Sequence, residues 1–195
     1  MTGGVACAVT VFVNFDGVTL TEGTDDATTD TSSIADGTFA PYAGTVPAED
    51  VFAAFEAIFA PYPVCATDVR PDEGPYAMVV VTADTSPYGP GVGELAGIDC
   101  GDGNPKSVAL VFENGSVDTA AGIAARIAHA FAHTLGLEHV DEPSDVLNVS
   151  SPGTSFVDAC SDLVGPQDPV CGAQHEAFCP PGQQNGHAEL SALGG

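Results

Sequence analysis

Runs of apolar residues along the chain predict the strands of a buried sheet. Residues 7–15 are β-branched and aromatic with partial alternation, which is typical of a strand. Residues 107–112 form another buried strand, and residues 76–82 are continuously apolar, which indicates a central strand covered on both faces. Residues 64–69 and 93–99 are shorter strand candidates, and the second is expected at an edge of the sheet.

Two longer segments have the spacing of helices. From Pro47 to Phe59, apolar residues recur every three or four positions, behind a proline and acidic residues that suit a helix N-terminus. Residues 117–135 are rich in alanine and follow Ser116, a candidate N-cap. A weaker helical stretch covers residues 186–193.

The order of these elements predicts an α+β domain. We expect a twisted, mainly parallel sheet with an antiparallel edge strand, packed against the two long helices. The 195 residues fit one domain with a self-sufficient core, divided into an upper part (about residues 1–136) and a short lower part (residues 137–195). Residues 17–44, rich in Thr, Asp, Gly and Ser, are predicted as a long loop.

The charge of the chain excludes several partners. There are 27 acidic residues against three basic ones, and the formal net charge is −24. Nucleic acids and anionic membranes are bound through Lys and Arg, so neither is an expected partner. No apolar run approaches the ~20 residues that span a bilayer. A solvated acidic surface is the plain interpretation, and we expect a monomer.

Six cysteines, with none in a Cys-x-x-Cys pair, predict three disulfides in an exported protein rather than a thiolate metal site. No signal peptide precedes Thr2, so the exported form would be the mature chain with its leader removed. We expect Cys65 to pair with Cys100. Of the last three cysteines, two are expected to pair with each other and one to reach back to Cys7.

The stretch from His129 to His139 carries the chemistry. His129 and His133 lie four residues apart in a predicted helix, so both can reach one ion at the roughly 2.0–2.1 Å of a zinc–nitrogen bond. Gly136 suits a helix end with positive φ, after which His139 can approach the same point. Three neutral imidazoles and one open position are typical of a catalytic zinc site.

The pattern His-x-x-x-His-x-x-Gly-x-x-His resembles the zinc signature of the metzincin metallopeptidases. The residues up to Asn148 resemble the segment that leads to the family's Met-turn, with spacing closest to the matrixins. The resemblance implies one Zn²⁺ on the three histidines, a secreted endopeptidase with peptide or protein substrates, and an edge strand at residues 93–99 that pairs with an extended substrate. The specific motifs cover about residues 127–150.

Two positions depart from the family. The glutamate that acts as its general base is replaced by Ala130, and the methionine of the Met-turn by Leu147. A methyl group cannot accept a proton, and losing a general base costs about 10²–10⁴ in rate. Leucine and methionine are similar in volume, so the second change is milder. We therefore expect an intact zinc site with slow or absent hydrolysis.

The origin of Ala130 stays open. An engineered Glu→Ala exchange would keep a self-cleaving or substrate-bound peptidase intact, whereas a natural pseudopeptidase would bind peptides or partners without cutting them. Leu147 favours natural drift. The otherwise well-kept motif, down to Gly136, favours an engineered or recently lost base, which is the leading interpretation. A non-catalytic zinc or calcium binding module would need only the histidines and the acidic residues.

Acidic residues in two segments are candidate Ca²⁺ ligands, although neither segment has the spacing of an EF-hand. A plain solvated loop is the alternative for the first segment. His175 and His187 have no partner spacing and are expected on the surface. The five candidate carboxylates are those of Asp25, Asp26, Asp30, Asp99 and Asp102.

Overall fold

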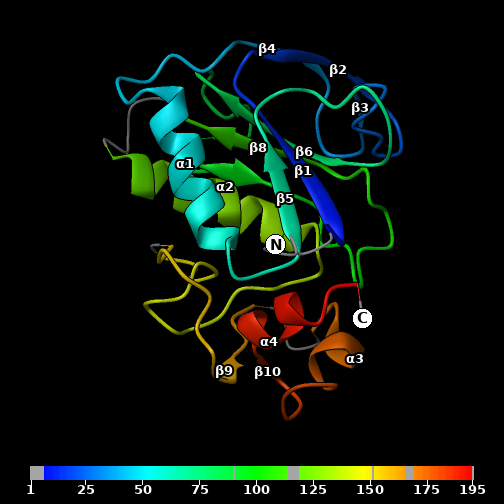
Figure 1. Cartoon of the computed structure of the whole chain (residues 1–195), viewed down its shortest axis with the longest axis vertical. Coiled ribbons are helices and arrows are strands. Elements are labelled where there is room, and N and C mark those ends of the chain that lie inside the picture. Colours follow the sequence, from blue (N-terminus) through cyan, green and yellow to red (C-terminus); the bar gives the residue numbers. More distant parts are fainter. Residues whose placement is uncertain (1–6, 90, 114–118, 151, 166–168, 195) are drawn as a thin grey trace, which may run out of the picture.

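A mainly parallel five-stranded sheet forms the centre of the molecule (Figure 1). The computed structural model describes residues 7–89, 91–113, 119–150, 152–165 and 169–194. The sheet has the order β5–β1–β6–β8–β7, and β7 pairs antiparallel with β8 at one edge. The predicted mixed α+β class and the antiparallel edge strand are thus confirmed. The strands are β1 (Val9–Asn14), β5 (Val64–Thr67), β6 (Ala77–Thr82), β7 (Glu94–Leu95) and β8 (Val108–Phe112).

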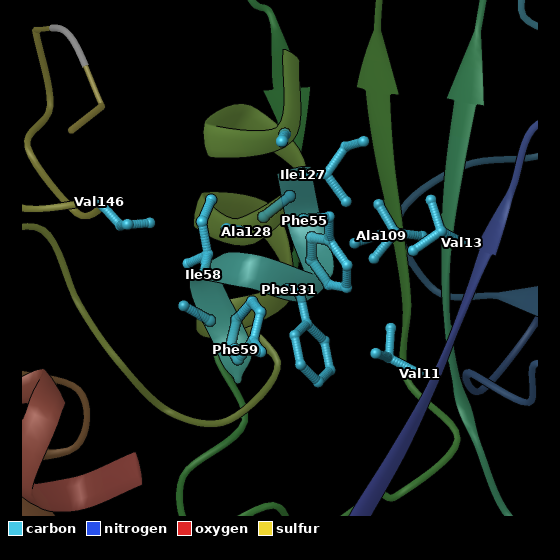
Figure 2. Packing of buried hydrophobic residues seen from close by; sticks show 14 of the residues in the cluster. Val11, Val13, Phe55, Ile58, Phe59, Ala109, Ile127, Ala128, Phe131 and Val146 are labelled. Carbon is cyan, nitrogen blue, oxygen red and sulfur yellow. The ribbon is translucent and has the colours of Figure 1, made fainter. Parts of the chain in front are cut away.

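Two helices, α1 (Ala48–Phe59) and α2 (Ala120–His133), cover one face of this sheet (Figure 1). Because successive strand residues point to opposite faces, every second residue of the central strands packs against the helices. Figure 2 shows Val11, Val13 and Ala109 of the sheet opposite Phe55 of α1 and Ile127 of α2, all in one buried cluster. This apolar packing fixes α2, and with it His129 and His133, relative to the sheet.

The other face of the sheet is covered by the segment predicted as a long loop. Leu20 and Phe39 from this segment pack against Phe12 and Met78 of the central strands. The prediction of a loop was therefore wrong, because strands that are apolar on both faces require a second cover. The segment folds into three short strands in the order β3–β2–β4, which are β2 (Val18–Glu22), β3 (Thr31–Ser32) and β4 (Gly37–Phe39).

The C-terminal residues form a lower part beyond one end of the sheet (Figure 1). The predicted weak helix over residues 186–193 is confirmed as α4, which is capped by the side chain of Asn185 at 2.9 Å from the backbone nitrogen of Ala188. None of the described helices is long and apolar enough to cross a membrane. The elements of this part are β9 (Ser161–Asp162), α3 (Gly172–His175), β10 (Gln183–Gln184) and α4 (Gly186–Ser191).

All six cysteines form disulfides, as predicted, but the expected pairing of Cys65 with Cys100 was wrong. Cys65 lies on β5 and Cys100 follows β7, at opposite edges of the sheet, and strand order in the sequence does not reveal this separation. Two of the last three cysteines do pair with each other, while the third reaches back to Cys100 and not to Cys7. The bonds are Cys7–Cys65, Cys100–Cys171 and Cys160–Cys179.

Candidate metal centre

The first two histidines of the site lie on α2. The hydroxyl of Thr119 accepts a backbone hydrogen bond at 3.1 Å and caps the first turn, and the helix ends at His133, two residues earlier than predicted. Ser116, the predicted N-cap, lies outside the described residues. His129 and His133 are one turn apart and only 3% and 8% exposed. Because both imidazole rings are buried on a packed helix, their positions relative to each other are fixed.

Gly136 provides the sharp turn that the sequence predicts. Its φ is +83° and its N–H donates to the carbonyl of His133 at 3.0 Å. A Cβ at this position would lie 2.9 Å from the Cα of Cys100 and 3.0 Å from the carbonyl oxygen of Asp99. Glycine is therefore required both for its backbone conformation and for the close approach of a second segment.

The turn brings His139 beside the helix pair. The three ring centroids are 4.7, 4.8 and 4.9 Å apart, and the Nε2 atoms of His129 and His139 are 3.0 Å apart. A tetrahedral ion with bonds of roughly 2.0–2.1 Å needs ligand nitrogens roughly 3.3 Å apart, so the trio fits one such ion. Among the described residues, these histidines are the only group of three or more potential ligands that could hold a metal.

Backbone carbonyls set the tautomers of the helix pair. Nδ1 of His129 donates to the carbonyl of Val146 at 2.8 Å, and Nδ1 of His133 to that of Leu137 at 2.7 Å. Each bond leaves Nε2 with a free lone pair. Burial lowers the pKa of His129 to about 4 and of His133 to about 3, and it also lowers the pKa of His139. All three imidazoles are therefore neutral at pH 7, the state that binds metal.

A cleft of about 660 Å³ lies over the trio. Ala130 lines it beside His129, and its methyl group is fully buried. Leu147 is also fully buried and belongs to the same apolar cluster as Ala130. Glu94 and Leu95 of the edge strand and Val149 also line the cleft. Position 130 is thus beside the ligands, and its side chain offers no proton acceptor.

One of the three basic residues, Arg126, is buried and ties the edge strand to α2. Arg126 is 8% exposed and donates to the carboxylates of Glu94 at 3.0 Å and Glu113 at 2.9 Å. It also donates to the carbonyl of Phe112 at 3.1 Å. Its spacing of four residues from Ala130 on one helix is the sequence signal that could have placed it at the cleft.

The first three candidate calcium ligands satisfy donors of the chain itself. Asp26 is paired with Lys106 at 2.9 Å and Asp30 with Arg70 at 2.5 Å. Asp25 accepts backbone hydrogen bonds from two other segments. These carboxylates therefore bond to groups of distant segments of the chain, and among the described residues they form no potential metal-binding group.

The other two candidates, Asp99 and Asp102, lie close enough for their charges to interact. Asp99 accepts a hydrogen bond from the backbone nitrogen of Asn104 at 2.6 Å. Burial, and then the charge of Asp99, raises the pKa of Asp102 to about 6. None of the five acidic residues belongs to a potential metal-binding group in the described parts of the chain, so calcium binding stays a prediction.

The expectation that His175 lies on the surface was wrong. The side chain is 1% exposed, with its two ring nitrogens 3.0 Å from Glu189 and 3.3 Å from Glu138. His187 is half-buried, and its Nδ1 lies 2.9 Å from the hydroxyl of Tyr62. Neither contact has a sequence signature, because both join residues that are far apart in the chain.

Comparison with known protein families and curated proteins finds no match to this chain. The functional interpretation therefore depends on the histidine trio, the cleft and the edge strand.

Proposed function

We propose that this protein is an exported zinc metalloendopeptidase of the metzincin type whose hydrolysis is impaired because position 130 lacks the general base. The observation that carries the proposal is the trio of His129, His133 and His139, with ring centroids 4.7–4.9 Å apart at the base of an open cleft. The antiparallel edge strand at the same cleft supports it. Three disulfides fit an oxidising compartment.

Each part of the cleft has a role in this proposal. A bound zinc ion would act as a Lewis acid toward a carbonyl oxygen and lower the pKa of water toward about 7. The three imidazoles would hold the ion, and the carbonyls of Val146 and Leu137 orient two of them. The free edge of β7 would pair with an extended peptide. Arg126 joins that edge to α2 through its ion pair with Glu94. Ala130 can neither take up nor deliver a proton.

A second candidate is a pseudopeptidase that binds peptides in this cleft without cleaving them. The observation that favours it is the packing of Ala130 and Leu147, which are both fully shielded from solvent within one apolar cluster. A glutamate at position 130 would have to reach the cleft from this packed site. The ligand trio and the edge strand do not depend on residue 130, so peptide binding would survive without chemistry.

The variant Ala130→Glu tests the first candidate. We expect it to gain about 10²–10⁴-fold in zinc-dependent cleavage of a broad substrate such as casein, because a positioned general base contributes that much. A chelator should abolish the gain. Ala130→Gln is the matched control, since it has the same length without the basic carboxylate, and it should remain inactive.

Ala130→Glu combined with Leu147→Met shows whether packing beneath the metal limits the gain. If neither glutamate variant cleaves casein at full zinc occupancy, the peptidase proposal fails and the pseudopeptidase takes its place. Retention of an extended peptide by the zinc-loaded chain, and its release by a chelator, would then support peptide binding. A chain that binds zinc but retains no peptide would leave only a metal-binding module.

A further inference from the structure

His139 differs from the other two ligands in what holds it. It lies beyond the end of α2, and none of the described carbonyls accepts a hydrogen bond from its Nδ1. Its own carbonyl accepts from the backbone nitrogen of Val164 at 2.9 Å. The position of this imidazole therefore depends on segments that come later in the chain.

Glu138, the residue before this ligand, is held by Gln184. The backbone nitrogen of Glu138 donates to Oε1 of Gln184 at 2.7 Å, and its carbonyl accepts from Nε2 of the same side chain at 3.1 Å. Gln184 is 1% exposed, so water does not compete for these bonds. One buried amide thus satisfies both main-chain groups of Glu138, much as a neighbouring strand would.

The side chain of Glu138 is held as well. Its carboxylate accepts from the backbone nitrogen of Cys171 at 2.9 Å and from Nε2 of His175 at 3.3 Å. Nδ1 of His175 contacts the carboxylate of Glu189 at 3.0 Å. A ring whose two nitrogens both face carboxylates donates from both, so His175 links Glu138 to α4.

A second glutamine reaches the preceding part of the same turn. Nε2 of Gln174 donates to the carbonyl of Leu135 at 3.1 Å and to Glu189 at 2.8 Å, while its Oε1 accepts from the backbone nitrogen of Gly101 at 2.7 Å. The turn between α2 and His139 is therefore enclosed by polar side chains from the C-terminal residues. We call Gln174, His175, Gln184 and Glu189 the C-terminal clamp.

We propose that the C-terminal clamp positions the third metal ligand, with Gln184 and His175 acting through Glu138 on His139, and so sets the metal affinity of the trio. The inference rests on the proposed zinc site. His129 and His133 keep their backbone positions without the clamp because both lie on the packed helix α2, although the Leu137 carbonyl that accepts from His133 belongs to the turn itself. If the turn loosened, His129 and His133 would stay on α2 while His139 became disordered. Residues that orient a metal ligand without touching the metal change metal affinity about 10–100-fold.

The test compares two adjacent glutamines of β10. Gln184→Ala removes both bonds to Glu138, whereas Gln183→Ala removes only an exposed bond to Asp162. Zinc affinity is measured by competition with a chelating dye, and Co²⁺ absorption reports the ligand set. We expect Gln184→Ala to weaken zinc binding about 10–100-fold and to reduce the tetrahedral Co²⁺ bands. Gln183→Ala should leave both unchanged.

A double-mutant cycle separates positioning from general destabilisation. In a His139→Ala background, Gln184→Ala should cause no further loss of zinc affinity if it acts through His139. An equal loss in both backgrounds, or no loss with the wild-type trio, would overturn the inference. If Gln184→Ala does not fold, His175→Gln enters the same cycle with the same criteria. Failure of the wild-type chain to bind zinc would reject the proposed site itself.

Discussion

The two helix ligands and the loop ligand of the candidate metal centre are supported in different ways. His129 and His133 lie on α2, which packs on the sheet, and each donates to a nearby carbonyl. His139 lies in a turn whose position depends on Gln184 and on the backbone of Val164. The backbone positions of His129 and His133 follow from helix geometry, and that of His139 from contacts across the fold.

Because of this difference, the helix pair and the loop ligand should respond differently to substitutions elsewhere in the chain. The helix pair should keep its geometry as long as α2 stays packed, because both rings are buried with satisfied Nδ1 atoms. The loop ligand should respond to changes 30 or more positions away in the sequence, since Cys171, Gln174 and Gln184 bond to residues of the turn. Three predictions test this difference between the helix pair and the loop ligand.

The largest effect is expected from removing a helix ligand. His133→Ala should weaken zinc binding by more than about 100-fold, beyond the range expected for a residue that only positions a ligand. It should also abolish most of the rise in melting temperature on zinc addition, because that rise follows from metal binding to the folded state. His187→Ala, outside the trio, is the control. Full zinc binding by His133→Ala would reject the assigned ligands.

An intermediate effect is expected at the junction between the two regions. Gly136→Ala should lower the free energy of unfolding by about 1–3 kcal/mol, from its positive φ, with an added cost from contact with Asp99 and Cys100. Gly74→Ala is the matched control, because its φ is +86° with open space around the new methyl group. Equal losses in the two variants, measured by urea denaturation, would show that the close approach adds nothing.

The smallest effect is a pH dependence of the metal-free protein. Burial holds the pKa values of His129 and His133 at about 4 and 3, below the ~6.5 of an unfolded chain, so between these values the unfolded state binds more protons. The free energy of unfolding should therefore fall as the pH drops below about 6.5, by at most about 1.4 kcal/mol per pH unit for each histidine.

Urea denaturation of the metal-free wild type and of His133→Ala between pH 7 and pH 5 measures this effect. The difference in slope isolates one histidine from the titration of the many carboxylates. A wild-type slope no steeper than that of His133→Ala would contradict the burial-driven shift.

The fold was predictable where a local pattern was sufficient. Apolar runs identified the central strands, and the spacing from Pro47 to Phe59 identified α1. The pattern failed for residues 17–44, because short strands with few apolar residues look like a loop until the sheet they cover is known. The partner of Cys65 was predicted wrongly for a related reason. The order of strands in a sheet is set by packing and not by position along the chain.

The histidine trio of the candidate metal centre could be predicted from a local sequence pattern. His129, His133 and Gly136 are related by helix geometry and by the φ that glycine allows, and both are local properties of the backbone. The contacts of Arg126 with the edge strand, and of His175 and Gln184 with Glu138 in the turn before His139, become visible only in the folded structure. These contacts join residues far apart in the chain, where polar side chains have no periodicity and become partners only when burial removes water.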